Sequence, residues 1–134
     1  MKTRDRILEA SLQMFNEQGE RAVTTNHIAA RLGISPGNLY YHFRNKQQII
    51  AELFERYEAE LEESLALPGG RGLDLDDKAR YVESLSESLW RYRFVQRDLE
   101  HLLASDAQVA ERYRQFSRRA LRAPRAAAPR RRSG

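Results

Sequence analysis

The stretch from Thr24 to Lys46 reads TTNHIAARLGISPGNLYYHFRNK, and its spacing decides the fold. Apolar residues recur at helical intervals at its start and predict a short helix, which Thr24 or Thr25 caps. The inward-facing residues of this helix are Ile28, Ala29 and Leu32. Gly33 comes next, and glycine readily adopts the positive φ that a sharp turn requires.

A second short helix is predicted from Pro36 to Phe43, with Ser35 as its N-cap and proline at its first position. Leu39 and Phe43 are four residues apart, so both are expected to face the core. The remaining residues face outward: Pro36, Gly37, Asn38, Tyr40, Tyr41 and His42. A helix that only packs in a core rarely carries so many polar and aromatic residues on its outer sides. A helix in the DNA major groove, which is about 12 Å wide, can contact bases and phosphates with these side chains. We therefore interpret the stretch as a helix-turn-helix whose second helix reads DNA.

A long helix is predicted to follow, from about residue 46 to 67, with Asn45 as its N-cap and Gln48 completing a capping box. Lys46 lies at the level of the reading helix, so we expect it to clamp a phosphate near the positive end of the helix dipole. Apolar residues at steps of three and four form one side of this helix. The other side is acidic and is predicted to be solvated; it consists of Glu58, Glu60, Glu62 and Glu63.

The rest of the chain is also predicted to be helical. A first helix from Thr3, as N-cap, to Gln18 stops at Gly19. After a flexible connector at 68–72, a fifth helix begins at Asp74 or Asp76, and its regular apolar stripe is expected to be buried. That stripe consists of Leu75, Ala79, Val82, Leu85 and Leu89. A sixth helix covers about 99–103, and a capping box of Ser105 and Gln108 opens a seventh.

Composition favours a soluble, cytoplasmic, DNA-binding protein. The 134 residues contain no cysteine, which excludes disulfides and thiolate chemistry, and no apolar run long enough to cross a bilayer. The N-terminus lacks the apolar segment of a signal peptide. Residues 1–47 carry seven Lys or Arg against four Asp or Glu, whereas residues 48–123 carry twelve against fifteen. A basic head suits a polyanion, because neutralising phosphates supplies sequence-independent affinity for DNA.

These motifs resemble the N-terminal domain of the TetR family of bacterial transcriptional regulators. The resemblance covers residues 3–67 and rests on ILEASLQMF, TTNHIAARLGIS and above all SPGNLYYHFRNK before a long amphipathic helix. It implies a homodimer on a palindromic operator, usually a repressor that a small molecule releases. We expect no cofactor and no metal. The resemblance also implies contacts to double-stranded DNA by Thr25, Asn26, Ser35, Pro36, Gly37, Asn38, Tyr40, Tyr41, His42 and Lys46. Pro36 departs from the polar residue that is common there, which weakens a side-chain base contact at that position.

The implied fold class is all-α: a three-helix helix-turn-helix bundle joined by a long fourth helix to a partial C-terminal helical domain. We predict a DNA-binding domain at 1–47, a linker helix and partial ligand and dimerisation region at 48–121, and a disordered basic tail at 122–134. In the family interpretation Trp90, Tyr92 and Phe94 line an effector pocket, and ordinary core packing is the equal alternative. The tail RAPRAAAPRRRSG is interpreted as a frameshift or truncation product, with a genuine basic arm as the alternative.

Two other classes of function were weighed. An enzyme would need a catalytic constellation, but His27, His42 and His101 have no metal-ligand spacing, and no nucleophile turn or Gly-rich nucleotide loop is present. The other alternative is a truncated helical interaction protein, which pairs with an intact relative or binds DNA only weakly. That alternative follows because shortening the C-terminal region would remove helices that hold two reading heads about 34 Å apart.

Overall fold

A computed structural model describes residues 1–65 and 74–122 of the chain. Within those ranges every regular element is a helix, so the all-α prediction is confirmed. The elements are α1 (Thr3–Gln18), a 3₁₀ turn η1 (Glu20–Ala22), α2 (Thr25–Leu32), α3 (Pro36–His42), α4 (Lys46–Leu65), α5 (Leu75–Arg91), α6 (Arg93–Arg97), α7 (Leu99–Ser105) and α8 (Ala107–Arg122). The predicted connector at 68–72 and the predicted tail after Arg122 lie outside the described residues. No helix in the described part of the chain is long and apolar enough to cross a membrane.

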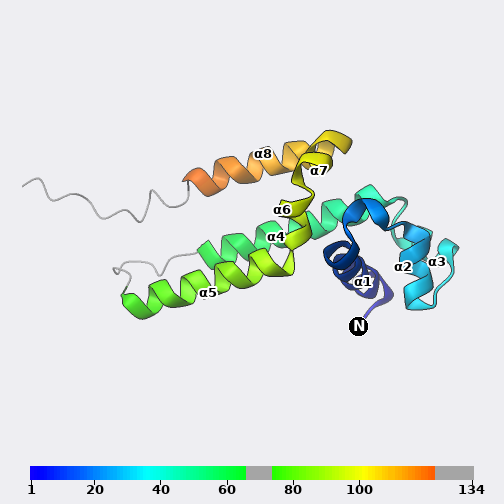
Figure 1. Cartoon of the computed structure of the whole chain (residues 1–134), viewed down its shortest axis with the longest axis horizontal. Coiled ribbons are helices and arrows are strands. Elements are labelled where there is room, and N and C mark those ends of the chain that lie inside the picture. The colour runs from blue at the N-terminus through cyan, green and yellow to red at the C-terminus, as the bar shows by residue number, and fades with distance from the viewer. Residues whose placement is uncertain (66–73, 123–134) are drawn as a thin grey trace, which may run out of the picture.

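The helices form a compact head and an extended body (Figure 1). The head consists of α1, α2 and α3 at one end of the molecule. The long helix α4 leaves the head, with α5 along one side of it and α8 along the other. The short helices α6 and α7 connect α5 to α8 and return the chain to the end of α1.

The helix α1 forms because its apolar residues share one face, and it ends where glycine allows a change of direction. Ile7, Leu8 and Phe15 are fully buried on that face. Gly19 has φ 87°, and its N–H donates to the Phe15 carbonyl at 2.9 Å. The predicted N-cap at Thr3 was wrong by one residue, because Thr3 already lies in the helix and Lys2 precedes it.

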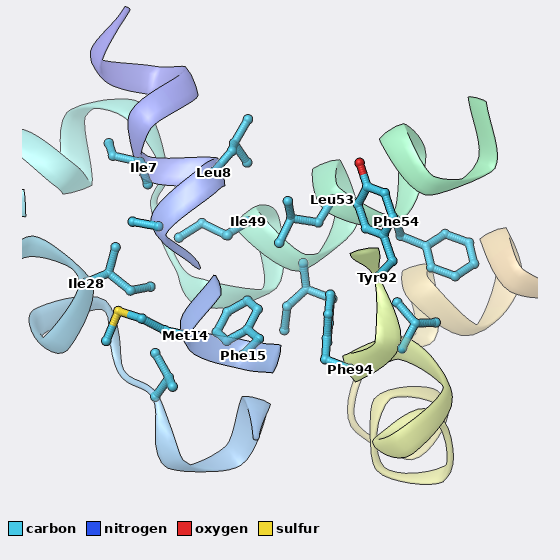
Figure 2. Close-up of a cluster of buried hydrophobic side chains, with 14 of the residues drawn as sticks. Ile7, Leu8, Met14, Phe15, Ile28, Ile49, Leu53, Phe54, Tyr92 and Phe94 are labelled. Atoms are coloured by element: carbon cyan, nitrogen blue, oxygen red, sulfur yellow. The ribbon is translucent and has the colours of Figure 1, made fainter. Parts of the chain in front are cut away.

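One continuous core joins the head to the body (Figure 2). Figure 2 shows Phe15 of α1 beside Phe94 of α6, and their ring centroids are 5.3 Å apart. Ile49 and Leu53 of α4 are buried in the same cluster, between the side chains of the head and those of the body. The head therefore does not pack as an isolated bundle, and its orientation depends on α4 and α6.

The acidic side of α4 is solvated only in part: Glu62 and Glu63 are exposed as predicted, whereas Glu58 and Glu60 contact neighbouring helices. Glu58 is buried and forms ion pairs with Arg112 and Arg119 of α8. Glu60 accepts from Ser88 at 3.1 Å and pairs with Arg91 at 2.5 Å, both from α5. The prediction failed for Glu58 and Glu60 because a row of carboxylates looks the same in sequence whether water or a neighbouring arginine satisfies it.

Most of the buried stripe predicted on α5 is exposed. Asp74, one of the two predicted starts, caps this helix. Leu75 and Val82 are exposed to 82% and 59%, and Leu85 is the one member of the stripe that is partly buried against the core. The helix packs on α4 through another, partly polar face, where the hydroxyls of Ser64 and Ser84 are 2.7 Å apart. The apolar stripe predicts an amphipathic helix correctly, but it does not say which partner covers the stripe.

The remaining helix ends differ from prediction in detail. The sixth predicted helix is α7, while the short helix α6 was not predicted. Asp106, rather than Ser105, caps α8, because its carboxylate accepts from the N–H of Gln108 at 2.8 Å. At the start of α4, Asn45 accepts from the Gln48 N–H at 2.9 Å as predicted. The Gln48 side chain, however, accepts from the N–H of Arg44, so the predicted capping box is displaced by one residue.

Candidate nucleic-acid interface

Local contacts fix both ends of α2, the first helix of the helix-turn-helix. The Thr24 hydroxyl accepts from the His27 N–H, and the His27 Nδ1 accepts from the Thr24 N–H, both at 3.2 Å. This reciprocal cap fixes the start of α2. At its other end Gly33 adopts φ 68° and ψ 27°, the left-handed conformation that the sequence predicts. The two short helices therefore meet at a defined angle.

Two apolar side chains hold α3 against the core. Leu39 and Phe43 are each 2% exposed, in agreement with the prediction, and the guanidinium of Arg4 lies 4.8 Å from the centre of the Phe43 ring. Ser35 caps the helix by accepting from the Asn38 N–H at 3.0 Å. Leu39 and Phe43 face inward, so the residues between and before them are presented to the outside. The predicted core residues of α2 agree with this arrangement, since Ile28 and Ala29 are buried and Leu32 is partly buried against them.

The outward side of α3 is polar and aromatic. Tyr40 is 62% exposed and Tyr41 is 84% exposed, which is unusual for large aromatic side chains without a binding partner. The other predicted contact residues are also at the surface: Asn26, Ser35, Pro36, Gly37 and Asn38 are exposed, and Thr25 and His42 are partly exposed. The Tyr41 and His42 rings meet edge to face, with centroids 5.2 Å apart. The structure thus leaves an aromatic and amide-bearing helix free to enter a groove.

Gly37 has no role that the protein's own packing explains. Its φ is not positive, and a Cβ placed on it would meet only the Ser35 Oγ, at 4.0 Å. Glycine inside a helix is about 0.5–1 kcal/mol less favourable than alanine, so a fold without other demands would not favour it. The absence of a side chain here instead leaves room for a partner to approach the α3 backbone.

The structure gives Lys46 a different role from the predicted phosphate clamp. Its ammonium donates to the carbonyls of Glu20 and Val23, at 2.9 and 3.0 Å, and pairs with the Glu20 carboxylate at 2.9 Å. An ammonium has three protons, and these three acceptors use them all. Lys46 therefore ties the turn after α1 to the start of α4, and in this conformation it has no proton free for DNA.

Arg44 is the cation that the sequence interpretation missed. It is exposed between α3 and α4, and within the described ranges no carboxylate pairs with it. Lys2, Arg6 and Arg21 of the head are likewise without an acidic partner among these residues, whereas Asp5, Glu17 and Glu20 are all paired. Glu9 is the remaining acid of the head and is exposed, so four cations and one carboxylate of the described head are left without a charged partner and its surface is basic. The local sequence offered no signal that could have distinguished the two cations, because the partner of Lys46 is Glu20, 26 residues away.

A polar joint fixes the head to the body at the C-terminal end of α1. The Asn16 side chain donates to the Arg91 carbonyl at 2.8 Å and accepts from the Phe94 N–H at 3.1 Å. Arg97 donates to the carbonyls of Phe15 and Asn16, which satisfies acceptors that a helix end leaves free.

Two further contacts reach the turn that follows α1. The Asp98 carboxylate accepts from the Glu20 N–H at 3.0 Å. The His101 Nε2 lies 3.3 Å from the Glu20 carboxylate, which also pairs with Lys46. A shift of α6 or α7 would therefore change the contacts of Glu20, the residue to which Lys46 at the start of α4 is bound.

The three aromatics predicted to line an effector pocket lie in different environments within the described part of the chain. Trp90 is 68% exposed, with the Arg93 guanidinium 4.2 Å from its ring centre. Tyr92 and Phe94 are buried in the core, Tyr92 against Tyr57 with ring centroids 5.2 Å apart. Core packing is thus the correct alternative for those two residues. The structure instead has an open groove of about 460 Å³ between α4 and α5, lined by Glu60, Glu63, Ser64, Ser84, Glu87, Ser88 and Arg91.

A capped helix, a glycine turn and a second helix with an exposed polar face define the class of helix-turn-helix DNA-binding proteins. Two family models match the chain: residues 7–53 match the bacterial regulatory proteins of the tetR family, and residues 56–129 match a TetR bacterial transcriptional repressor model. The chain therefore belongs to the TetR family of bacterial transcriptional regulators.

Individual relatives agree with this membership. The chain is similar to the crystal structure of a TetR-family transcriptional regulator from Marinobacter aquaeolei VT8, with 55% identity and a TM-score of 0.88, covering 92% of this chain and 61% of that one. It is 33% identical over 73 residues to the transcriptional regulator AcrR of Shigella flexneri, covering 51% of this chain and 34% of that protein. It also resembles SmeT in its complex with triclosan, with 28% identity and a TM-score of 0.58, covering 93% and 66% of the two chains. The chain spans about a third of the length of AcrR and three fifths of the Marinobacter regulator.

Proposed function

We propose that this chain is a sequence-specific DNA-binding transcriptional regulator that acts as a repressor in the cytoplasm. The observation that carries the proposal is the exposed face of α3, with Tyr40 and Tyr41 outward and Leu39 and Phe43 inward. A helix held in this way can enter the major groove with its first residues against base edges. Membership of the TetR family supports the same role.

Each exposed residue of the interface has a chemistry that suits a position on DNA. The amides of Asn26 and Asn38 can donate and accept on a base edge, and the hydroxyls of Thr25, Ser35 and Tyr40 suit phosphate oxygens. Tyr41, which is 84% exposed, is proposed to contact bases, with Pro36 and Gly37 permitting close approach of the backbone. His42 and Arg44 are proposed as phosphate ligands, in place of Lys46.

Control of this activity is proposed to follow the family pattern. A homodimer would place two α3 helices on the half-sites of a palindromic operator, about 34 Å apart. SmeT was solved with triclosan, and a small molecule is accordingly proposed to release this regulator as well. The Asn16 and Arg97 contacts support such coupling, because they link α6 directly to the end of α1.

Selection from a library of random DNA duplexes tests the proposal without knowledge of the operator. The 134-residue chain is expected to enrich a palindromic motif and to bind it at least about a thousandfold more tightly than a scrambled duplex. The variant Tyr41→Ala should lose about 1–3 kcal/mol on the enriched duplex and much less on the scrambled one. Gln108→Ala, an exposed change in α8, is the control that should alter neither. Equal affinity for all duplexes would refute specific binding.

A further inference from the structure

The first turn of α2 carries a histidine at a position where a capping box usually has a glutamate or glutamine. The His27 Nδ1 accepts from the Thr24 N–H at 3.2 Å, and the His27 N–H donates to the Thr24 hydroxyl at 3.2 Å. A glutamate could complete the same cap, since the cap requires only an acceptor on this side chain. Histidine adds a second ring nitrogen that the cap does not use.

The cap determines which nitrogen of the His27 ring carries the proton. A neutral imidazole has one N–H and one acceptor nitrogen. Because Nδ1 accepts from Thr24, the proton lies on Nε2. His27 is exposed, and no group within residues 1–65 and 74–122 accepts from Nε2. The ring therefore presents a hydrogen-bond donor at the surface, in an orientation that the contact with Thr24 sets.

The cap also determines where this donor lies. A side chain that reaches back to the N–H of Thr24 is held at the N-terminal end of α2, beside Thr25 and Asn26, and not along the side of the helix. Thr25 and Asn26 belong to the proposed DNA interface, and α2 packs on α3 in the head (Figure 1). In helix-turn-helix proteins the first helix crosses the DNA backbone while the second lies in the major groove. A donor at this end of α2 is therefore expected to meet a phosphate.

We propose that the neutral His27 side chain donates its Nε2–H to a phosphate oxygen of the bound DNA. This contact rests on the proposed function and adds to it a residue that the family resemblance did not supply. The same side chain then fixes the start of α2 and holds that start on the DNA backbone. A glutamate at this position would preserve the cap but would place a carboxylate beside the phosphate.

Three variants separate the DNA contact from the cap. His27→Ala removes both, and it should weaken binding about fivefold or more on the enriched and the scrambled duplex alike, because a phosphate contact carries no sequence information. His27→Gln retains an oxygen for the Thr24 N–H and an amide N–H for the phosphate, so its affinity should stay within about twofold of the wild type. Thr24→Ala removes the capping hydroxyl but leaves the ring, so it should lower the midpoint of urea unfolding and leave both affinities within about twofold.

Fluorescence anisotropy at pH 8, where histidine is normally neutral, measures these affinities at several salt concentrations. A neutral donor displaces no counterion, so the salt dependence of His27→Ala should parallel that of the wild type. A shallower salt dependence would show that His27 binds as a cation and would overturn the proposal. Equal losses of affinity in His27→Ala and Thr24→Ala would overturn it too, because His27 would then act only through the cap.

Failure of this contact is distinguishable from failure of the proposed function. If the wild type selects an operator and His27→Ala binds that operator as tightly, the phosphate contact is refuted and the proposed function stands. If the wild type binds all duplexes equally, specific regulation is refuted, whereas a loss of affinity on every duplex in His27→Ala still supports the phosphate contact.

Discussion

At the scale of single residues, the clearest finding is that Lys46 and Glu20 are partners inside the protein. Both side chains are largely removed from solvent, and the lysine also holds two backbone carbonyls of the turn before α2. Position in the sequence made Lys46 look like a phosphate ligand, because it sits just after the reading helix. Lys46, and not the nearby Arg44, is bound inside the protein because of its contact with Glu20, 26 residues away. Local spacing in the sequence does not contain that information.

Replacement of Lys46 by methionine is expected to destabilise the fold by about 2–4 kcal/mol, because it leaves the buried Glu20 carboxylate without its ammonium partner. Urea unfolding followed by circular dichroism measures this loss. The double variant Lys46→Met with Glu20→Gln should recover part of it, since no buried charge remains. If the Lys46→Met variant is as stable as the wild type but binds DNA more weakly, Lys46 is a phosphate ligand and the assignment made here is wrong.

Burial raises the pKa of Glu58, although Arg112 and Arg119 act in the opposite direction. A carboxyl whose pKa is higher in the folded state than in the unfolded state binds protons more readily in the folded state. The free energy of unfolding therefore falls as the pH rises from the pKa of the unfolded state through the raised pKa of the folded state. Glu58→Gln should flatten this fall at pH values above the ordinary pKa of a glutamate, measured by urea unfolding at each pH. Glu111→Gln is the control, because its pKa is lowered by the exposed contact with Arg114. An unchanged slope in Glu58→Gln would contradict the assignment.

At the scale of elements, sequence predicted where helices form better than what they contact. The turn at Gly33 and the helix starts at Ser35 and Asn45 were predicted correctly. Helix capping and a positive φ depend only on residues a few positions apart in the sequence. The orientation of α5 and the contacts of Glu58 and Glu60 on α4 were mispredicted. An amphipathic pattern predicts that one face of a helix is buried, but it does not identify the element that buries it, because that element comes from a distant part of the chain.

The same reasoning applies to the aromatics of α5 and α6. Trp90, Tyr92 and Phe94 are close in sequence, yet one is on the surface and two are in the core. A break between α5 and α6 at Tyr92 redirects the chain, and no proline or glycine marks its position in the sequence. Contacts within one helical turn were therefore predictable, and the joint between α1 and α6 was not.

At the scale of the whole molecule, inward and outward residues of the head have separate tasks. The inward residues Leu39 and Phe43 belong to a core that continues through α4 to α6, so they determine stability and orientation. The outward residues of α3 contribute little to that core and are proposed to contact DNA. If this division holds, stability and DNA affinity can be changed independently.

Gly37→Ala tests that division most directly, because it adds one methyl group to the outward side of α3 where the protein has room for it. The free energy of unfolding should stay within about 1 kcal/mol of wild type, in the stabilising direction, since alanine restricts the unfolded chain. Affinity for the enriched duplex, measured by fluorescence anisotropy, should fall at least about tenfold, or about 1.4 kcal/mol. A variant that folds as well as wild type and binds the enriched duplex equally well would contradict the claim that α3 enters the DNA groove.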